Sequence, residues 1–258
     1  MKRIELHTDT LYSEELSFLS PRELIRACAD SGCVAVAITD RNSTAAFLEA
    51  EQEAQRLGIR LIYGLTLDCV DRDDRYAVTV LAKDQDGLTQ LFQLLTMETS
   101  NQFSFGQCIT RRQLEEHRSH LLVGSCAKDG QIVRAILHGA PTDAVEDATS
   151  GYDYLELPLE PYEVSAELIR LSRRLSIPLC AVQQARLTPR ADAVMIHAYR
   201  AAALYRKQAL VGNQLMNLEE LECAFTELYV LPDERLAVQQ ALQQGPEQLA
   251  AQIQPVLP

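Results

Sequence analysis

Short hydrophobic runs alternate along the chain with longer segments whose apolar residues recur every three to four positions. The short runs indicate strands buried in a core, and the longer periodicity indicates helices that bury one face. Their alternation is typical of βαβ units around a parallel sheet or barrel. The predicted strands are Arg3–His7, Val34–Ile38, Arg60–Tyr63, Tyr76–Ala82, Leu121–Gly124, Tyr154–Leu157 and Leu179–Val182.

Two of the intervening helices carry clear end signals. Ser20, Pro21 and Glu23 combine an N-cap, a proline at the first helical position and a capping-box glutamate, and Gly32 ends that helix. Residues Ser43–Gly58 form a second helix with a serine start and a glycine stop, and the third strand follows at once. These signals predict that a short connection joins each of the two helices to the strand that follows it.

The end of the chain is rich in Leu, Ala, Gln and Glu and predicts two or three helices, with breaks at Pro232 and Pro246. Seven strands is close to the number in a closed α/β barrel. We therefore expect an α/β fold, a distorted (β/α)7 barrel related to the TIM barrel, with extra C-terminal helices. We expect one domain over residues 1–258, with the barrel in 1–205 and the helical extension in 206–258.

Composition narrows the functional classes. The chain has 258 residues, of which 47% are hydrophobic and 23% charged, as in one compact domain. No apolar run is long enough to span a bilayer and the N-terminus lacks a signal-peptide core, so we expect a cytoplasmic protein without a membrane partner. A net charge of −12 opposes direct nucleic-acid binding. The seven cysteines are scattered without a CxxC pair, so we expect reduced, mostly buried thiols.

Candidate chemistry is sought at the carboxyl ends of the predicted strands, because a barrel of parallel strands presents its functional side chains there. Polar residues and one cysteine follow most of these strands. They are His7 and Asp9, Asp40 and Arg41, Thr66, Cys126, and Gln184 and Arg186.

The first of these segments resembles a known motif. Residues Ile4–Ser13, reading IELHTDTLYS, are similar to the opening of the PHP (polymerase and histidinol phosphatase) family, in which a strand ends in His-x-His and a serine follows four residues later. His7 and Ser13 match this pattern, and Asp9 stands where the second histidine belongs. The resemblance implies a PHP-like barrel.

Two further segments resemble the family with one change each. Residues Ala37–Arg41 read AITDR, where the family has A-I-T-D-H, so Arg41 replaces a histidine. Residues Tyr63–Thr66 read YGLT, where the family has Y-G-x-E, so Thr66 replaces a bridging glutamate. The order and spacing of the motifs agree with the family, whereas the ligands do not.

Later segments resemble one branch of the family, the PHP domain of the PolC-type DNA polymerase III alpha chain. In that branch an exonuclease is inserted after the third strand, but only Leu67–Arg75 intervenes here, so we expect no inserted exonuclease. The segments with this resemblance are Tyr76–Lys83, Gly87–Phe92, His117–Cys126, Tyr152–Glu156 and Asn217–Phe225.

The resemblance implies a trinuclear metal site built from nine positions. Those positions hold His7, Asp9, Asp40, Arg41, Thr66, Ala77, Cys126, Gln184 and Arg186 in this chain. Arginine repels cations, alanine has no donor atom, and threonine and glutamine are weak neutral ligands. We therefore expect a vestigial site in which His7, Asp9, Asp40 and Cys126 hold at most one Zn or Mn ion. No catalytic residue is assigned, and we expect no other cofactor.

Arg41 and Arg186 suggest what replaced the metals, because two guanidinium groups near Asp9 and Asp40 would balance buried carboxylates. The same cationic groups could bind phosphate or sulfate in the barrel mouth. Three functional classes follow, and we favour the first. They are a noncatalytic PHP module with a structural or interaction role among polymerase or replisome proteins, a metal-dependent phosphoesterase or 3′–5′ exonuclease with a reduced site, and an anion-binding domain that uses Arg41 and Arg186.

Overall fold

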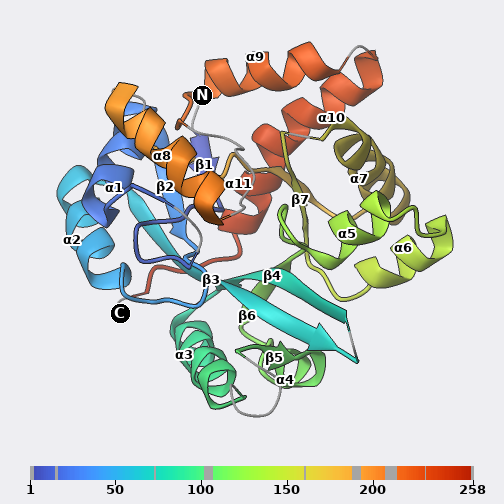
Figure 1. The fold of residues 1–258 in the computed structure, drawn as a ribbon, viewed down its shortest axis with the longest axis horizontal. Coiled ribbons are helices and arrows are strands. Elements are labelled where there is room, and N and C mark those ends of the chain that lie inside the picture. Colours follow the sequence, from blue (N-terminus) through green and yellow to red (C-terminus); the bar gives the residue numbers. More distant parts are fainter. Residues whose placement is uncertain are drawn as a thin grey trace.

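The computed structural model describes residues 3–14, 17–72, 74–101, 107–159, 161–187, 193–206, 214–229 and 231–256. Its larger sheet has the strand order β1-β2-β3-β4-β6, with β5 paired to β3, and β7 and β8 form a second sheet (Figure 1). A parallel bridge between Gly124 and Tyr154 links the two sheets. The strands are β1 (Arg3–Glu5), β2 (Cys33–Ile38), β3 (Arg60–Asp71), β4 (Asp74–Ala82), β5 (Ile109–Thr110), β6 (Leu121–Gly124), β7 (Leu155–Leu157) and β8 (Leu179–Ala181).

The result is an α/β fold with a curled, half-barrel sheet. All seven predicted strands are present, and β5 is an additional short strand that the sequence pattern did not predict. The prediction that all strands run parallel was wrong for β4, which is antiparallel to both β3 and β6. The physical reason is the short connection between β3 and β4, since a tight hairpin turn can join only antiparallel strands.

The hairpin changes the place of one candidate residue. Strand β3 does not end at Tyr63 but continues to Asp71, so Thr66 lies inside the strand and not in a loop after it. Thr66 pairs in register with Thr79 of β4. Most of the interval Leu67–Arg75 is therefore strand that extends the hairpin.

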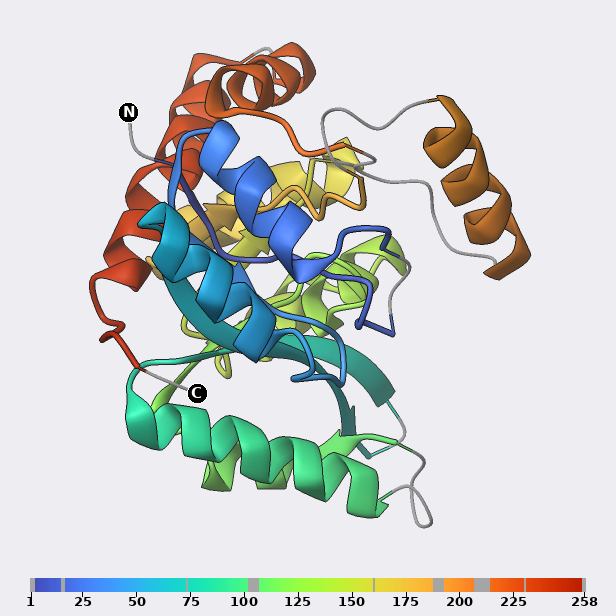
Figure 2. The ribbon, with the colours of Figure 1, turned by 90° about the vertical axis from the view of Figure 1, so that its left-hand side faces the viewer.

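Helices cover both sides of the curled sheet. Figure 1 shows α1 and α2 beside β2, and α3 and α4 below β3 and β4; Figure 2 shows α8 set apart from the other helices. The helices are α1 (Pro21–Asp30), α2 (Phe47–Leu57), α3 (Gln85–Ser100), α4 (Arg111–Glu116), α5 (Gln131–Leu137), α6 (Thr142–Thr149), α7 (Tyr162–Leu175), α8 (Ala193–Arg206), α9 (Leu218–Leu228), α10 (Pro232–Leu242) and α11 (Gln244–Ala250).

The predicted helix ends are partly confirmed. Ser20 and Glu23 form the reciprocal capping box at the start of α1. Helix α2 ends at the left-handed Gly58, as predicted, but it begins at Phe47. The Ser43 hydroxyl instead accepts a hydrogen bond from the amide of Ala45, a local turn that competes with helix formation.

The C-terminal helices pack against the sheet from the side opposite to the carboxyl ends of β1 and β2. Pro232 is the first residue of α10, as predicted, and Pro246 lies in the first turn of α11. The guanidinium of Arg60 in β3 donates to the carbonyl of Ala250 at 3.1 Å. Gly245 approaches the Leu179 carbonyl so closely that a Cβ atom would lie 2.0 Å from it. The division of the chain at residue 205 stays a prediction.

The apolar core has one part between the outer face of the larger sheet and helices α1, α2 and α3, and a second part around α7 and α10. A smaller cluster inside the curled sheet includes Leu6, Ile62, Tyr154 and Leu249. Among the helices of the described ranges, none has the length and apolar character needed to cross a membrane.

Candidate functional site

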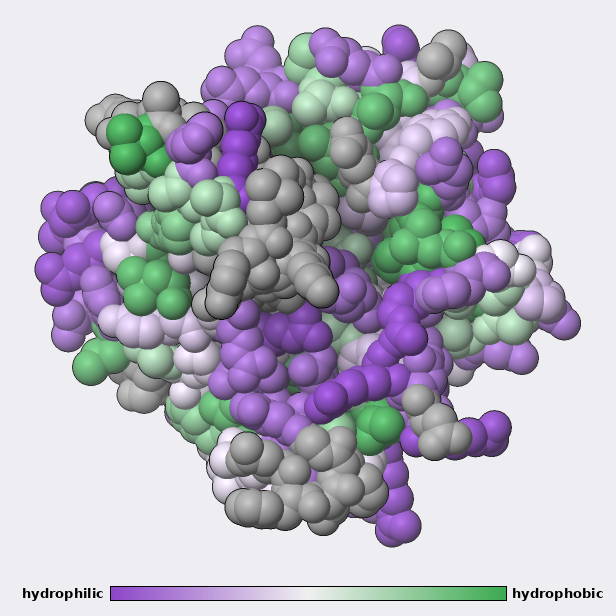
Figure 3. Space-filling view, in the orientation of Figure 1, coloured by the Kyte–Doolittle hydropathy of each residue, from purple (hydrophilic) through white to green (hydrophobic). Residues whose placement is uncertain are grey.

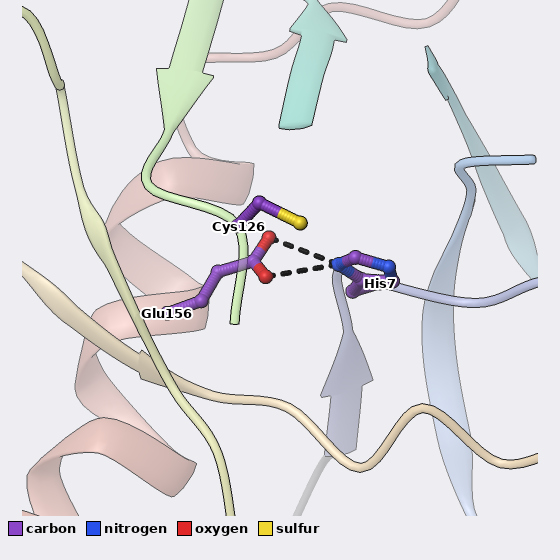
Figure 4. Close-up of side chains that lie close together, drawn as sticks. All are labelled: His7, Cys126 and Glu156. Atoms are coloured by element: carbon purple, nitrogen blue, oxygen red, sulfur yellow. Dashed lines mark hydrogen bonds and ion pairs between the residues drawn. The ribbon is translucent and has the colours of Figure 1, made fainter. Parts of the chain in front are cut away.

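The site is centred on His7, which follows β1 and is almost completely buried. Its Nδ1 atom lies 2.9 and 3.1 Å from the two carboxylate oxygens of Glu156, in the middle of β7 (Figure 4). The hydroxyl of Thr79 lies 3.4 Å from the same nitrogen. On the other side of the ring, the amide nitrogen of Gln184 lies 3.3 Å from Nε2. Residues from three separate segments, namely β7, β4 and the loop after β8, therefore surround one imidazole.

The electrostatics around His7 favour its charged form. Burial alone would lower the pKa of the imidazole, but the charge and hydrogen bond of Glu156 outweigh burial and raise the pKa above its ordinary value. The carboxylate of Asp9, 3.8 Å from Nε2, acts in the same direction. The two acidic side chains thus favour the protonated form of the ring.

Asp9 is enclosed by hydrogen-bond donors. Its Oδ2 atom forms an ion pair with the guanidinium of Arg186, and its Oδ1 accepts a hydrogen bond of 2.8 Å from the hydroxyl of Ser13. Asp9 is 1% exposed and Arg186 is 4% exposed, so the pair is shielded from water. This contact agrees with the hypothesis that Arg186 balances a buried carboxylate.

Asp40 lies next to this pair and is fully buried. Its carboxylate accepts hydrogen bonds from the amide and the hydroxyl of Thr10, the latter at 2.6 Å. Burial and the neighbouring charge of Asp9 raise the pKa of Asp40 to about 7, although the Thr10 hydrogen bonds act in the opposite direction. Asp40 therefore carries only part of a negative charge near neutral pH.

Arg41 lies at the rim of the site. Its guanidinium forms ion pairs with Asp68 of β3 and, at 3.5 Å, with Asp129. These acceptors differ from the expected Asp9 and Asp40, because the rim offers carboxylates that need less desolvation of the guanidinium. Figure 3 shows hydrophilic residues gathered in the middle of this face of the molecule, over β3 and β4.

The neutral positions of the predicted site also lie in it. Thr66 is buried, and its hydroxyl has no hydrogen-bond partner within the described part of the chain. Ala77 lies two residues before Thr79 on the same face of β4 and offers no donor atom there. The Cys126 thiol donates to the Lys128 carbonyl at 2.9 Å, and burial raises its pKa. Thr66 and Ala77 therefore offer a cation no strong ligand.

The backbone is strained at two positions of this site. Cys126 has a φ of 45° and Gln184 a φ of 52°, in the left-handed region that residues other than glycine seldom adopt. Cys126 lies two residues after β6, and Gln184 lies three residues after β8. Both residues turn their chains at the mouth, which is the end of the curled sheet where His7, Asp9 and Asp40 lie. Both loops of the site thus keep an unusual backbone geometry.

One set of donors does fall close together. Ligand atoms of His7, Cys126 and Glu156 lie within 4.8 Å of one another, as a single metal ion would need (Figure 4). The predicted single-ion set contained His7 and Cys126, but it paired them with Asp9 and Asp40. Sequence reasoning missed Glu156, Thr79 and Thr10. An acidic residue inside the apolar run Tyr154–Leu157 was the available signal for Glu156.

The residues present do not fit a trinuclear metal centre. The Arg186 guanidinium is bonded to Asp9, one of the nearest carboxylates that a cluster would need. Thr66 stands in place of a bridging carboxylate, and a hydroxyl cannot bridge two cations at neutral pH as a carboxylate does. Multinuclear hydrolysis requires adjacent cations to be held together, and among the described residues of this site Thr66 and Arg186 stand at positions where such ligands would be needed.

Comparison with known proteins defines the family. The PHP domain model matches residues 5–156, more than half of the chain. The chain belongs to the PHP domain family. Similar proteins include the PolC-type DNA polymerase III of Bacillus subtilis (strain 168), 37% identical over 100 residues, which are 39% of this chain and 7% of that protein. The PolC-type enzyme of Lacticaseibacillus paracasei is 27% identical over 220 residues, 72% of this chain and 15% of that protein.

This PHP domain thus spans less than a fifth of the length of the curated relatives it matches. Among solved structures, an amidohydrolase from Chromobacterium violaceum aligns with a TM-score of 0.46 and 16% identity, over 70% of this chain and 87% of that one. A two-domain protein from Bacteroides vulgatus that contains a predicted PHP-like metal-dependent phosphoesterase aligns with a TM-score of 0.47 and 12% identity, over 69% of this chain and 50% of that one. The family assignment rests on the sequence match.

Proposed function

We propose that this chain is a noncatalytic PHP domain with a structural or interaction role in DNA replication, related to the PHP domain of PolC-type polymerases. The observation that carries the proposal is the buried ion pair between Arg186 and Asp9 beside His7. A guanidinium stays protonated at every physiological pH, so it opposes cations permanently. It also occupies the carboxylate that metal ions would need.

The same contacts account for a stable fold without metal ions. Arg186 is paired with Asp9, and His7, whose protonated form is favoured, is paired with Glu156. Buried charges are tolerated only when they are paired and hydrogen-bonded, and these pairs meet both conditions. The mouth therefore has the properties of a structural network that replaces a cofactor.

We also propose that the curled sheet is a distorted (β/α)7 barrel that side chains help to close. The Arg3 guanidinium in β1 donates to the Gln183 side chain after β8 at 3.3 Å. It also donates to the Met216 carbonyl, which precedes α9. These contacts join the first strand to the segment after the last one, where the backbone pairing of the described strands leaves a gap.

Elemental analysis combined with activity assays tests the proposal. The protein is purified after growth with added Mn and Zn, dialysed, and assayed with a chromogenic phosphomonoester and with single-stranded DNA carrying a labelled 5′ end. We expect less than one metal ion per chain and no turnover above that of the His7→Ala variant. Stoichiometric metal with turnover that His7→Ala abolishes would overturn the noncatalytic reading. Specific capture of polymerase or clamp proteins by the immobilised chain would support the interaction role.

A single metal ion is the second candidate, because His7, Cys126 and Glu156 offer three donors, the number found in many catalytic zinc sites. A bound zinc ion would supply a Lewis acid that activates water. The chain itself would have to release the Cys126 proton and the His7 proton, so affinity should fall steeply as the pH is lowered. Competition with a zinc chelator at pH 6 and pH 8 tests this. Equal affinity of wild type and Cys126→Ser would exclude the site.

An anion-binding role for Arg41 and Arg186 has less support, since both guanidiniums form ion pairs with carboxylates of the chain. Titration with inorganic phosphate and sulfate, followed by calorimetry and by thermal unfolding, tests it. We expect no saturable binding in the millimolar range. Saturable binding that Arg41→Gln abolishes would restore the anion-binding alternative.

A further inference from the structure

One buried carboxylate outside the mouth has no hydrogen-bond partner. Glu98 belongs to the last turn of α3 and is 0% exposed. Neither of its two carboxylate oxygens forms a hydrogen bond within the described part of the chain. A buried carboxylate is costly unless donors or a cation balance its charge, so this unpaired group calls for a physical explanation.

Hydrogen bonds connect the end of α3 to the rim of the mouth. The Asn101 side chain, one helical turn after Glu98, donates to the Cys108 carbonyl at 3.0 Å. Gln107 directly precedes Cys108, and its side-chain amide donates to the Glu14 carboxylate at 3.2 Å. Glu14 is exposed and follows the loop that carries the first residues of the mouth. This chain of bonds brings the buried end of α3 to an exposed carboxylate.

A further buried oxygen without a partner lies beside Glu14. The Asn42 side-chain nitrogen donates to the Glu14 carboxylate at 2.9 Å, and this bond fixes which end of the amide is nitrogen and which is oxygen. The Oδ1 atom of Asn42 is buried and accepts no hydrogen bond from the described residues. Two oxygens of Glu98 and one of Asn42 are therefore acceptors that lack a donor in the same region.

The charges around Glu98 add to the cost of its ionised form. Burial raises the pKa of the Glu98 carboxyl to about 7, and the charges of Glu14 and Asp68 act in the same direction. The Gln107 side chain and the charge of Arg75 act in the opposite direction. The Arg75 guanidinium itself donates to the Gln107 carbonyl at 2.6 Å. Without a cation, the Glu98 carboxyl therefore takes up a proton near neutral pH.

We propose that Glu98, Glu14 and Asn42 form a binding site for a hard divalent cation, for which calcium is the best fit. Two carboxylates and an amide carbonyl are oxygen donors of the kind that calcium prefers, whereas zinc favours nitrogen and sulfur. Calcium also accepts irregular geometry and water ligands, so it suits donors from three separate segments. The exposed Glu14 gives ions access from solvent. The site is separate from the donors around His7, so its test does not depend on the proposed function.

Calcium titration of the metal-free protein tests the site. The full chain is treated with EDTA, transferred to pH 8, where most of the Glu98 carboxyl is ionised, and titrated with calcium chloride by calorimetry. We expect one ion per chain with a Kd of about 0.1–1 mM. In about 10 mM calcium chloride, the midpoint of thermal unfolding should rise by about 3–10 °C relative to sodium chloride of equal ionic strength.

Variants locate the bound ion. Glu98→Gln keeps the shape of the side chain and should weaken calcium binding at least about tenfold, and Glu14→Gln, at an exposed position, should weaken it at least about threefold. The matched control is Asp86→Asn in the first turn of the same helix, where the exposed Asp86 lies near Asp84 and His120. Its calcium affinity should equal that of wild type. The proposal is overturned if calcium shows no saturable binding up to about 10 mM, if Glu98→Gln binds calcium as tightly as wild type, or if Asp86→Asn abolishes binding.

Discussion

Replacing Arg186 with methionine removes the guanidinium but keeps an apolar side chain of similar length. The buried Asp9 carboxylate then keeps the hydrogen bond from the Ser13 hydroxyl, and the His7 ring lies 3.8 Å away. Removing one partner of a buried ion pair costs about 3–5 kcal/mol of folding free energy. The Ser13 hydrogen bond offsets about 1 kcal/mol of that loss. We therefore expect Arg186→Met to lower the free energy of unfolding by about 2–4 kcal/mol at pH 7.

Protonation sets a ceiling on this cost and makes it depend on pH. A buried carboxylate can escape its charge by taking up a proton. For an aspartate with an ordinary pKa near 3.9, protonation costs about 4 kcal/mol at pH 7 and about 1.5 kcal/mol at pH 5. A buried carboxylate without a cationic partner is disfavoured in its charged form, so the stability of the variant is lost as the pH rises. The penalty of Arg186→Met should therefore shrink between pH 7 and pH 5. Asp9→Asn leaves the Arg186 guanidinium buried without its carboxylate, and a guanidinium cannot deprotonate. The stability loss of Asp9→Asn should therefore not shrink between pH 7 and pH 5.

Urea unfolding followed by circular dichroism at both pH values measures these differences. The matched control is Arg112→Met, whose pair with Glu116 is solvent-exposed, so this change should leave the free energy of unfolding almost unchanged. The double variant of Asp9→Asn and Arg186→Met should cost at least about 2 kcal/mol less than the sum of the single changes. A penalty no larger than that of Arg112→Met, or one independent of pH, would refute the buried ion pair.

Further predictions concern other buried groups. Burial, followed by neighbouring carboxylates, raises the pKa of Glu98 to about 7, so the stability that protonated Glu98 provides is lost as the pH rises from about 4.5 through 7. Between pH 5 and pH 8, the free energy of unfolding of Glu98→Gln in urea should therefore rise by about 1–3 kcal/mol relative to that of wild type, and equal pH profiles of the two proteins would contradict this. A Cβ at Gly124 would lie 2.3 Å from the buried Tyr154 ring, so Gly124→Ala should lower the free energy of unfolding by about 1–3 kcal/mol. The double variant with Tyr154→Leu should lose less stability than the sum of the two single changes, and an unchanged thermal midpoint of Gly124→Ala would exclude the clash. NMR titration should find the pKa of His7 above its ordinary value, and Glu156→Gln should lower it; no change on that substitution would mean that the pair does not control the ring.

The elements of the fold were largely predictable from local signals, whereas the pairing of the strands was not. Hydrophobic runs located seven of the eight strands that the structure describes, and the Ser20 capping box located the start of α1. The pattern could not show that β3 extends to Asp71, because the polar Thr66 and Asp68 interrupt its apolar run. Because β3 was predicted to end at Tyr63, the sequence showed no sign of a hairpin between β3 and β4. Parallel strands were therefore expected.

The candidate site was predictable only as far as single positions could be matched to a motif. His7, Asp9, Asp40 and Arg186 were named correctly as neighbours of the mouth, and Arg186 does pair with Asp9. Glu156 was missed because it lies within β7, whereas functional side chains were expected at the carboxyl ends of strands and in the loops after them. The partners of Arg41 could not be foreseen, since Asp68 faces the rim only because β3 is longer than predicted.

The arrangement of the mouth separates two properties that usually occur together, a strained backbone and a set of ligands. Cys126 and Gln184 keep left-handed conformations, and the Glu156 carboxylate supports the first of these loops by accepting the Ala127 amide at 2.7 Å. That hydrogen bond serves the loop whether or not a cation is present. A backbone held by contacts of this kind can persist after its metal ligands change, provided that the remaining charges are neutralised. Arg186 does so for Asp9. Strained loops at this site are therefore no evidence for hydrolysis by themselves.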